Sequence, residues 1–88
     1  MNLRQLQTLT TFLEQGSFAA TGDTVGLSHS AISVQMQRLE EELGATLFDR
    51  TNRPPTLTRE GTAVAAIARD ILGLMESMKS AAAGEELP

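Results

Sequence analysis

The sequence predicts a small, mainly α-helical domain with one short two-stranded hairpin and a long C-terminal helix. Three observations lead to this prediction. In three segments, apolar residues recur every three or four positions, which is the spacing of one helix face, and a shorter segment between the first two of them has two apolar residues seven positions apart. A Ser, Thr or Asn precedes each segment and can accept the free N–H groups of a first helical turn. Between the third and fourth segments, an apolar pair and the run Asn-Arg-Pro-Pro are typical of a strand and a turn.

The composition of the 88 residues limits the classes of function. A hydrophobic content of 41% is enough for one small core and leaves no room for a second domain. The absence of cysteine excludes disulfides and thiolate chemistry. Three phenylalanines are the only aromatic residues, so a stacking platform for single-stranded nucleic acid is not expected. No apolar run approaches the roughly 20 residues of a membrane span, and we expect neither a signal peptide nor a membrane partner.

The charge opposes general binding to nucleic acid. The formal net charge is -4, whereas Lys and Arg that neutralise phosphates dominate non-specific affinity. Between residues 28 and 59, however, four arginines balance four acidic residues, so the excess of acid lies elsewhere. A DNA site in this chain must depend on where its cations are placed.

Two helices are expected at the N-terminus. The first begins after the N-cap Asn2 and ends at Gly16. The second is short, runs from Phe18 to about Val25, and lies between the cap Ser17 and the terminator Gly26.

Gly22 lies inside the second predicted helix, where glycine costs about 1 kcal/mol relative to alanine. Either two helices approach closely at this point, or the helix is weak. We favour the close approach.

The third predicted helix is the segment on which the functional interpretation depends. It starts after the cap Ser28 and ends at Gly44, and one inward stripe collects Ile32, Met36, Leu39 and Leu43. The outward face offers hydroxyls, an amide and a guanidinium, which can contact base edges and phosphates. These outward residues are Ser30, Ser33, Val34, Gln37 and Arg38. The face is either a DNA-reading surface or merely the solvated side of an amphipathic helix.

The connection between the second and third helices favours DNA reading. Only Gly26-Leu27-Ser28 separates the two helices. Two short helices joined by so tight a turn are typical of a helix-turn-helix.

A small hairpin is expected next. Leu47 and Phe48 can form one strand and residues 56–57 the other. Two prolines, including Pro54, stiffen the tip that displays Arg53. Beside a helix-turn-helix such a hairpin is a wing, and Arg53 is either an exposed turn charge or a contact to phosphate or the minor groove.

The last predicted helix is capped by Thr58 and runs from Arg59 to about Ala83, a length of roughly 35 Å at 1.5 Å per residue. It is too long for a domain of this size. Its apolar residues alternate at three and four positions, as in a heptad seam. They are Val64, Ile67, Ile71, Leu74 and Met78, with Met75 widening the stripe. The helix either packs wholly on its own domain or pairs with a second copy, and we expect a homodimer.

Neither catalysis nor metal binding is expected. No nucleophile is paired with a base, and His29 is the only histidine in a chain without cysteine. His29 is then a base contact or a solvated residue at a helix start. An enzyme fragment remains a distant alternative.

Other charges near the third helix have structural interpretations. Arg50 is expected to anchor the hairpin, and residues 40–42, three glutamates, to form a solvated face. Arg38 either reaches a phosphate or pairs with Glu41 or Glu42 along the helix.

The chain resembles the N-terminal winged helix-turn-helix domain of the LysR-type transcriptional regulators. The resemblance covers nearly the whole chain. It rests on LRQL at residues 3–6, GSF at 16–18, LSHSAIS at 27–33, QRLEEELGATLFDRT at 37–51 and LTREG at 57–61.

The resemblance implies a homodimer joined through the long helix, with two recognition helices in successive major grooves of double-stranded DNA and wings in the adjacent minor grooves. It divides the chain into a DNA-binding domain at residues 1–58, a dimerisation helix at 59–83 and the start of a hinge at 84–88. It also implies a cytoplasmic bacterial protein that continues into an effector-binding domain. A small-molecule effector and a contact to RNA polymerase are therefore expected for the full-length protein, and no cofactor for this piece.

The candidate DNA contacts, from the residues and from the resemblance together, are Ser17, Ser28, His29, Ser30, Ser33, Val34, Gln37, Arg38, Arg53 and Pro54. Four departures from the family pattern stand out. His29 replaces a common Gln, Val34 stands where a basic residue is frequent, and Thr24 replaces a frequent Arg or Lys. Thr21-Gly22 also stands where paired alanines are usual. With fewer cations than its relatives, the domain is expected to bind weakly by itself.

Two rival interpretations stay open. The nearer one is a winged helix-turn-helix of another regulator family. The other is a protein-interaction module in which the long helix is the functional element and DNA binding has been lost. The acidic net charge is the best support for that second rival.

Overall fold

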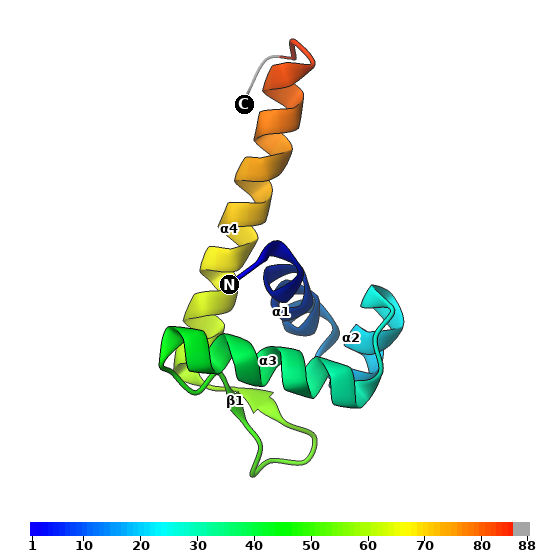
Figure 1. Ribbon diagram of the computed structural model, residues 1–88, viewed down its shortest axis with the longest axis vertical. Coiled ribbons are helices and arrows are strands. Elements are labelled where there is room, and N and C mark those ends of the chain that lie inside the picture. The colour runs from blue at the N-terminus through cyan, green and yellow to red at the C-terminus, as the bar shows by residue number, and fades with distance from the viewer. Residues whose placement is uncertain (86–88) are drawn as a thin grey trace.

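The computed structural model describes residues 1–85 and shows four helices and one two-stranded hairpin in that range. Figure 1 shows three helices gathered into one body, with the hairpin on one side and the long fourth helix extending away on the other. The molecule is accordingly elongated, with extents of 47 × 26 × 19 Å. The elements are α1 (Leu3–Gln15), α2 (Phe18–Val25), α3 (His29–Leu43), β1 (Phe48–Asp49), β2 (Thr56–Leu57) and α4 (Arg59–Ala82).

All four predicted N-caps are confirmed. The side chains of Asn2, Ser17, Ser28 and Thr58 each accept a backbone N–H from the first turn of the helix that follows. Between α2 and α3, Gly26 adopts a φ of 77°, a left-handed conformation that most residues avoid. The chain can therefore leave α2 and enter α3 within three residues.

The hairpin and the end of the long helix lie within one residue of their predicted positions, since the first strand is Phe48–Asp49 where Leu47 and Phe48 were expected. The two strands are antiparallel, with Phe48 opposite Leu57 and Asp49 opposite Thr56. The long helix ends at Ala82, one residue earlier than expected. Of the expected hinge at residues 84–88, only the first two lie in the described part of the chain.

Three phenylalanines form the centre of the core. Phe12 of α1, Phe18 of α2 and Phe48 of β1 pack edge to face, with ring centroids 4.9 to 5.2 Å apart. This cluster joins the two N-terminal helices to the base of the hairpin.

The inward stripe of α3 is confirmed for three of its four residues. Ile32, Met36 and Leu39 are completely buried. The prediction for Leu43 is wrong, because this residue lies in the last turn of α3, past the core, and 39% of its surface is exposed.

Gly22 marks a close approach, but not one between two helices. A Cβ atom at this position would collide with the backbone carbonyl oxygen of Leu27 in the turn. The same turn donates its Leu27 N–H to the Gly22 carbonyl at 3.0 Å. Ile32 of α3 is more distant, at 3.9 Å from the Cβ position. The glycine therefore lets the turn fold back over α2.

Gly22→Ala should lower the thermal unfolding midpoint, because the turn must move to admit the methyl group. Gly73→Ala is the matched control: Gly73 lies in α4 with nothing within 4 Å of its Cβ position. Alanine there should be neutral or stabilising, by up to about 1 kcal/mol. Thermal unfolding followed by circular dichroism measures both variants, and equal midpoints for the two would contradict the close approach.

Candidate nucleic-acid interface

The first turns of α3 bring most of the candidate reading residues to the surface. Among them only Ser33 is half-buried, and the exposed ones are His29, Ser30, Val34, Gln37 and Arg38. The outward face therefore offers small side chains first and longer polar ones further along the helix.

The first turns of α2 and α3 are each capped by the hydroxyl group of the serine that precedes the helix. Ser17 Oγ accepts the N–H of Ala20 at 3.1 Å, and Ser28 Oγ accepts that of Ala31 at 3.2 Å. Ser28 Oγ also lies 3.3 Å from Ser30 Oγ. Both helix starts present the positive end of a helix dipole, which favours an anion such as phosphate.

His29 rests on the core although it is exposed. Its ring meets the ring of Phe18 edge to face, with centroids 5.4 Å apart. Since Phe18 is 3% exposed and packed among the other phenylalanines, it supports His29 from below. The structure thus holds this side chain at the start of α3.

The wing tip lies beside the start of α3. Exposed Arg53 and Pro54 line one open cleft together with His29. Within the tip, the side-chain amide of Asn52 donates to Thr56 Oγ1 at 2.7 Å, which ties the two sides of the loop together. The tertiary structure therefore places the wing arginine and the first residue of α3 on one surface.

Asp49 supports the same loop from β1. The Thr51 hydroxyl and then the Thr51 N–H donate to its carboxylate and lower the pKa of Asp49 below its ordinary value. Because the pKa is lower in the folded chain, this stabilisation is present above the ordinary pKa of an aspartate and is lost as the pH falls through the folded-state value. The loop support is complete at neutral pH.

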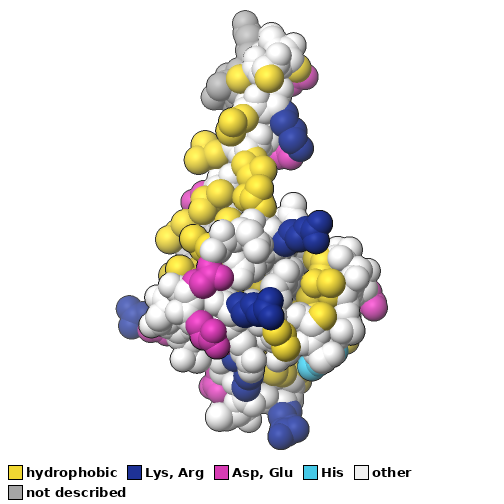
Figure 2. Space-filling view, in the orientation of Figure 1, with side chains coloured by type: hydrophobic (Ala, Val, Ile, Leu, Met, Phe, Trp, Pro, Cys, Tyr) yellow, Lys and Arg dark blue, Asp and Glu magenta, His cyan; other side chains and the backbone are white. Residues whose placement is uncertain are grey.

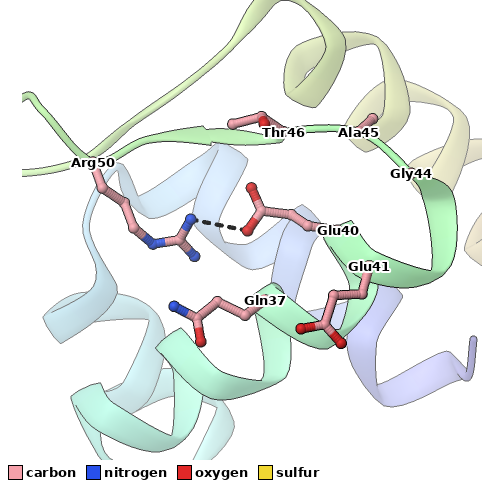
Figure 3. A pocket seen from close by; sticks show the side chains of 7 residues that line it. All are labelled: Gln37, Glu40, Glu41, Gly44, Ala45, Thr46 and Arg50. Carbon is pink, nitrogen blue, oxygen red and sulfur yellow. Dashed lines mark hydrogen bonds and ion pairs between the residues drawn. The ribbon is translucent and has the colours of Figure 1, made fainter.

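The Glu40 carboxylate joins α3 to the hairpin, as Figure 3 shows for its contact with Arg50. Its Oε2 accepts the backbone N–H of Leu47 at 2.8 Å and that of Phe48 at 3.2 Å, while Arg50 Nη1 donates to Oε1 at 2.9 Å. The Arg50 guanidinium also lies 5.6 Å from the centre of the Phe48 ring. The prediction that Arg50 anchors the hairpin is confirmed.

The prediction of a solvated glutamate face is wrong for Glu40, whereas Glu41 and Glu42 are exposed as predicted. The side chain of Glu40 is only 13% exposed, because the loop after α3 turns back over it. Glu42 accepts the side-chain amide of Gln5 at 3.2 Å and pairs with the amino group of Met1. Of the two exposed glutamates, Glu41 and Glu42, only Glu41 has no side-chain partner in residues 1–85.

Glu40→Gln should lower the free energy of unfolding by about 1 to 3 kcal/mol, because an amide cannot satisfy two backbone N–H groups and a guanidinium together. Glu41→Gln makes the same chemical change on the exposed neighbour and should have little effect. Urea denaturation measures both. If the two variants unfolded at the same urea concentration, the Glu40 junction would not support the hairpin.

Arg38 and Arg4 extend the cationic surface. Arg38 is exposed and makes no ion pair with Glu41 or Glu42 in residues 1–85, so the pairing alternative is absent from the structure. It shares a cleft with Arg4 of α1, which sequence reasoning missed. Residues 4 and 38 are too far apart for any spacing rule, and an exposed arginine in a first helix carries no signal alone.

The apolar face of α4 is exposed beyond the body. Figure 2 shows hydrophobic side chains following this helix outward. Ile67, Leu74 and Met78 have 59%, 67% and 71% of their surface exposed, and Ile71 has 37%. Val64 and Met75 are half-buried, while Ala65 and Ala68 pack against the core. The alternative that this helix packs wholly on its own domain therefore does not hold for residues 1–85.

No helix in residues 1–85 is both long and apolar enough to cross a membrane.

Residues 3–62 match the family of bacterial regulatory helix-turn-helix proteins named lysR. The chain belongs to the LysR family. Among curated relatives, this LysR domain is 38% identical over 80 residues to the HTH-type transcriptional regulator PtxR of Pseudomonas aeruginosa, covering 91% of the chain and 26% of PtxR. It is 32% identical over 88 residues to the uncharacterized HTH-type transcriptional regulator YfiE of Escherichia coli, covering 100% of the chain and 30% of YfiE. The chain thus spans less than a third of these relatives.

Solved structures confirm the winged-helix fold of this LysR domain. The BenM DNA-binding domain in complex with benA site 1 DNA superposes with a TM-score of 0.86 at 34% identity, covering 93% of this chain and 95% of that one. Full-length CbnR complexed with its target DNA gives a TM-score of 0.84 at 35% identity, covering 93% of this chain and 28% of CbnR. The relatives are transcriptional regulators and the family is not enzymatic, so the chain is not an enzyme.

Proposed function

We propose that this LysR domain binds double-stranded DNA sequence-specifically, as a homodimer on a partly palindromic promoter site. One observation carries the proposal: the exposed start of α3 and the Arg53 wing tip form one surface, on a fold that the BenM domain shows in a complex with DNA. In this proposal residues 1–58 contact DNA and residues 59–83 form the dimer.

In this proposal, the outward face of α3 lies in the major groove and recognises the base sequence. His29, Ser30 and Ser33 can exchange hydrogen bonds with base edges, and Gln37 can do so further along the helix. Val34 has 47% of its surface exposed and no polar group, so its suitable partner is a thymine methyl.

The cations and the N-termini of α2 and α3 supply most of the binding affinity in this proposal. Arg53, next to Pro54 on the wing, suits a phosphate or a narrow minor groove, and Arg38 suits a phosphate. Ser17 and Ser28 place two helix starts where backbone amides can meet the DNA backbone.

Arg53→Ala should weaken binding to all duplexes alike and flatten the salt dependence, because a phosphate contact carries no sequence information. His29→Ala should instead change which base is preferred at one position of each half-site. Binding titrations on randomised duplex, followed by sequencing of the bound fraction, separate the two effects. If both variants changed base preference in the same way, this division of roles would be wrong.

The homodimer rests on the exposed stripe of α4. Two copies of this helix can bury the apolar side chains that the body leaves uncovered, and a two-fold arrangement would present two α3 helices to one duplex.

Leu74→Glu should convert the dimer to a monomer and weaken binding to a palindromic site, because it buries a charge in the seam. Ala66→Glu adds the same charge to an exposed position of α4 that lies about 80° to 140° around the helix from the four stripe residues 67, 71, 74 and 78, and it should leave the dimer intact. Analytical ultracentrifugation reports the mass of each variant. A monomeric wild-type domain at micromolar concentration would refute the proposed dimer.

The net charge of -4 favours a second candidate, a dimerising protein-interaction module that has lost DNA binding. Anisotropy titration against randomised duplex at low salt discriminates between the two. Binding at micromolar dimer supports the DNA reader, and its absence supports the interaction module.

For the whole regulator we propose a small-molecule effector, a cytoplasmic location and a contact to RNA polymerase. Support for the effector comes from full-length LysG of Corynebacterium glutamicum, which is 32% identical to this chain and was solved with its effector Arg bound.

A further inference from the structure

We propose that Arg4 and Arg38 form a second DNA phosphate contact, on the side of α3 opposite the wing. The inference rests on the proposed DNA binding and adds to it a residue, Arg4, and a second edge of the DNA footprint. A cleft of about 640 Å³ lies between the start of α1 and the outward side of α3. Its lining includes Arg4 and Arg38 together with Ser28, Ser30 and Val34.

The two flanks of α3 follow from helix geometry. At 100° per residue, His29 and Ser33 lie on the side that meets the wing, whereas Ala31 and Arg38 lie about 140° to 180° away on the side that meets α1. Ser30 and Val34 lie between the two flanks. The reading face of α3 is therefore bordered by the wing arginine on one side and by the two cleft arginines on the other.

Duplex geometry places phosphates on both flanks of an inserted helix. A helix with its side chains is about 10–12 Å across and fills a major groove about 12 Å wide. The phosphates of the two strands then pass along either side of the inserted helix. Arg53 can contact the phosphates of one strand, and the cleft residues Arg4 and Arg38 can contact those of the other.

Both cleft guanidinium groups are available for such a contact. Arg4 and Arg38 are exposed, and neither makes a side-chain hydrogen bond or an ion pair in residues 1–85. Figure 2 shows basic side chains on the face of the body where α1 and α3 meet.

The acid that lines the same cleft is already engaged. Glu42 pairs with the amino group of Met1 and accepts the Gln5 amide, and these hydrogen bonds lower the pKa of Glu42. Its charge is thus partly compensated within the domain, which leaves the two arginines as the uncompensated charges of the cleft.

The test compares Arg4→Ala with Arg4→Lys and with Arg69→Ala. Arg69 is an exposed arginine on α4, so its removal makes the same change in net charge away from α3. Affinity for one wild-type-selected duplex is measured by anisotropy over a series of salt concentrations. Arg4→Ala should flatten the slope of log K against log salt by about 0.9 per subunit, without changing base preference. Arg4→Lys should keep the wild-type slope, and Arg38→Ala should flatten it as Arg4→Ala does.

The outcomes separate this inference from the proposed function. If the wild-type domain bound DNA but Arg4→Ala and Arg69→Ala had equal slopes, the second phosphate contact would be overturned and DNA binding would stand. If the folded wild-type domain bound no duplex, both would fail. Circular dichroism of each variant confirms that the domain remains folded.

Discussion

The position of the wing depends on one carboxylate near the C-terminal end of α3. Glu40 lies in α3, yet its carboxylate oxygens accept hydrogen bonds from the hairpin segment. The donors are the backbone N–H groups of Leu47 and Phe48 and the guanidinium of Arg50. An acid next to a DNA-binding surface would normally repel phosphate. Here its charge is matched by Arg50 and by backbone dipoles, and the group serves to orient the wing toward the start of α3.

Pairing of acidic groups with partners inside the body also explains how a domain of net negative charge can present a DNA-binding face. Of the three glutamates near the end of α3, two are engaged by partners within the body, whereas Arg4, Arg38 and Arg53 are left exposed. Acidic residues on α4 lie along the helix that extends away from the body (Figure 1). Screening in salt limits interactions between exposed charges to about 10 Å, so local placement outweighs the net charge of the chain.

The long helix combines two packing tasks on different faces. Small residues, Ala65 and Ala68, let the first half of α4 lie close against the body. Beyond that point the body ends while the apolar stripe continues through Leu74 and Met78. The outer part of α4 lies at the opposite end of the molecule from the wing (Figure 1), which is compatible with the dimer and the DNA contact proposed above.

The helices, their caps, the tight turn, the hairpin and the exposed faces of α3 and α4 could be predicted from the sequence alone. These features are encoded locally, because a cap, a left-handed glycine or a helical period involves residues only a few positions apart. Four further features became visible only in the folded molecule: the turn covers Gly22, Leu43 lies past the core, Glu40 binds the hairpin, and Arg4 lines the same cleft as Arg38. Each of these depends on which distant segment packs against a residue, and no periodicity within one segment contains that information.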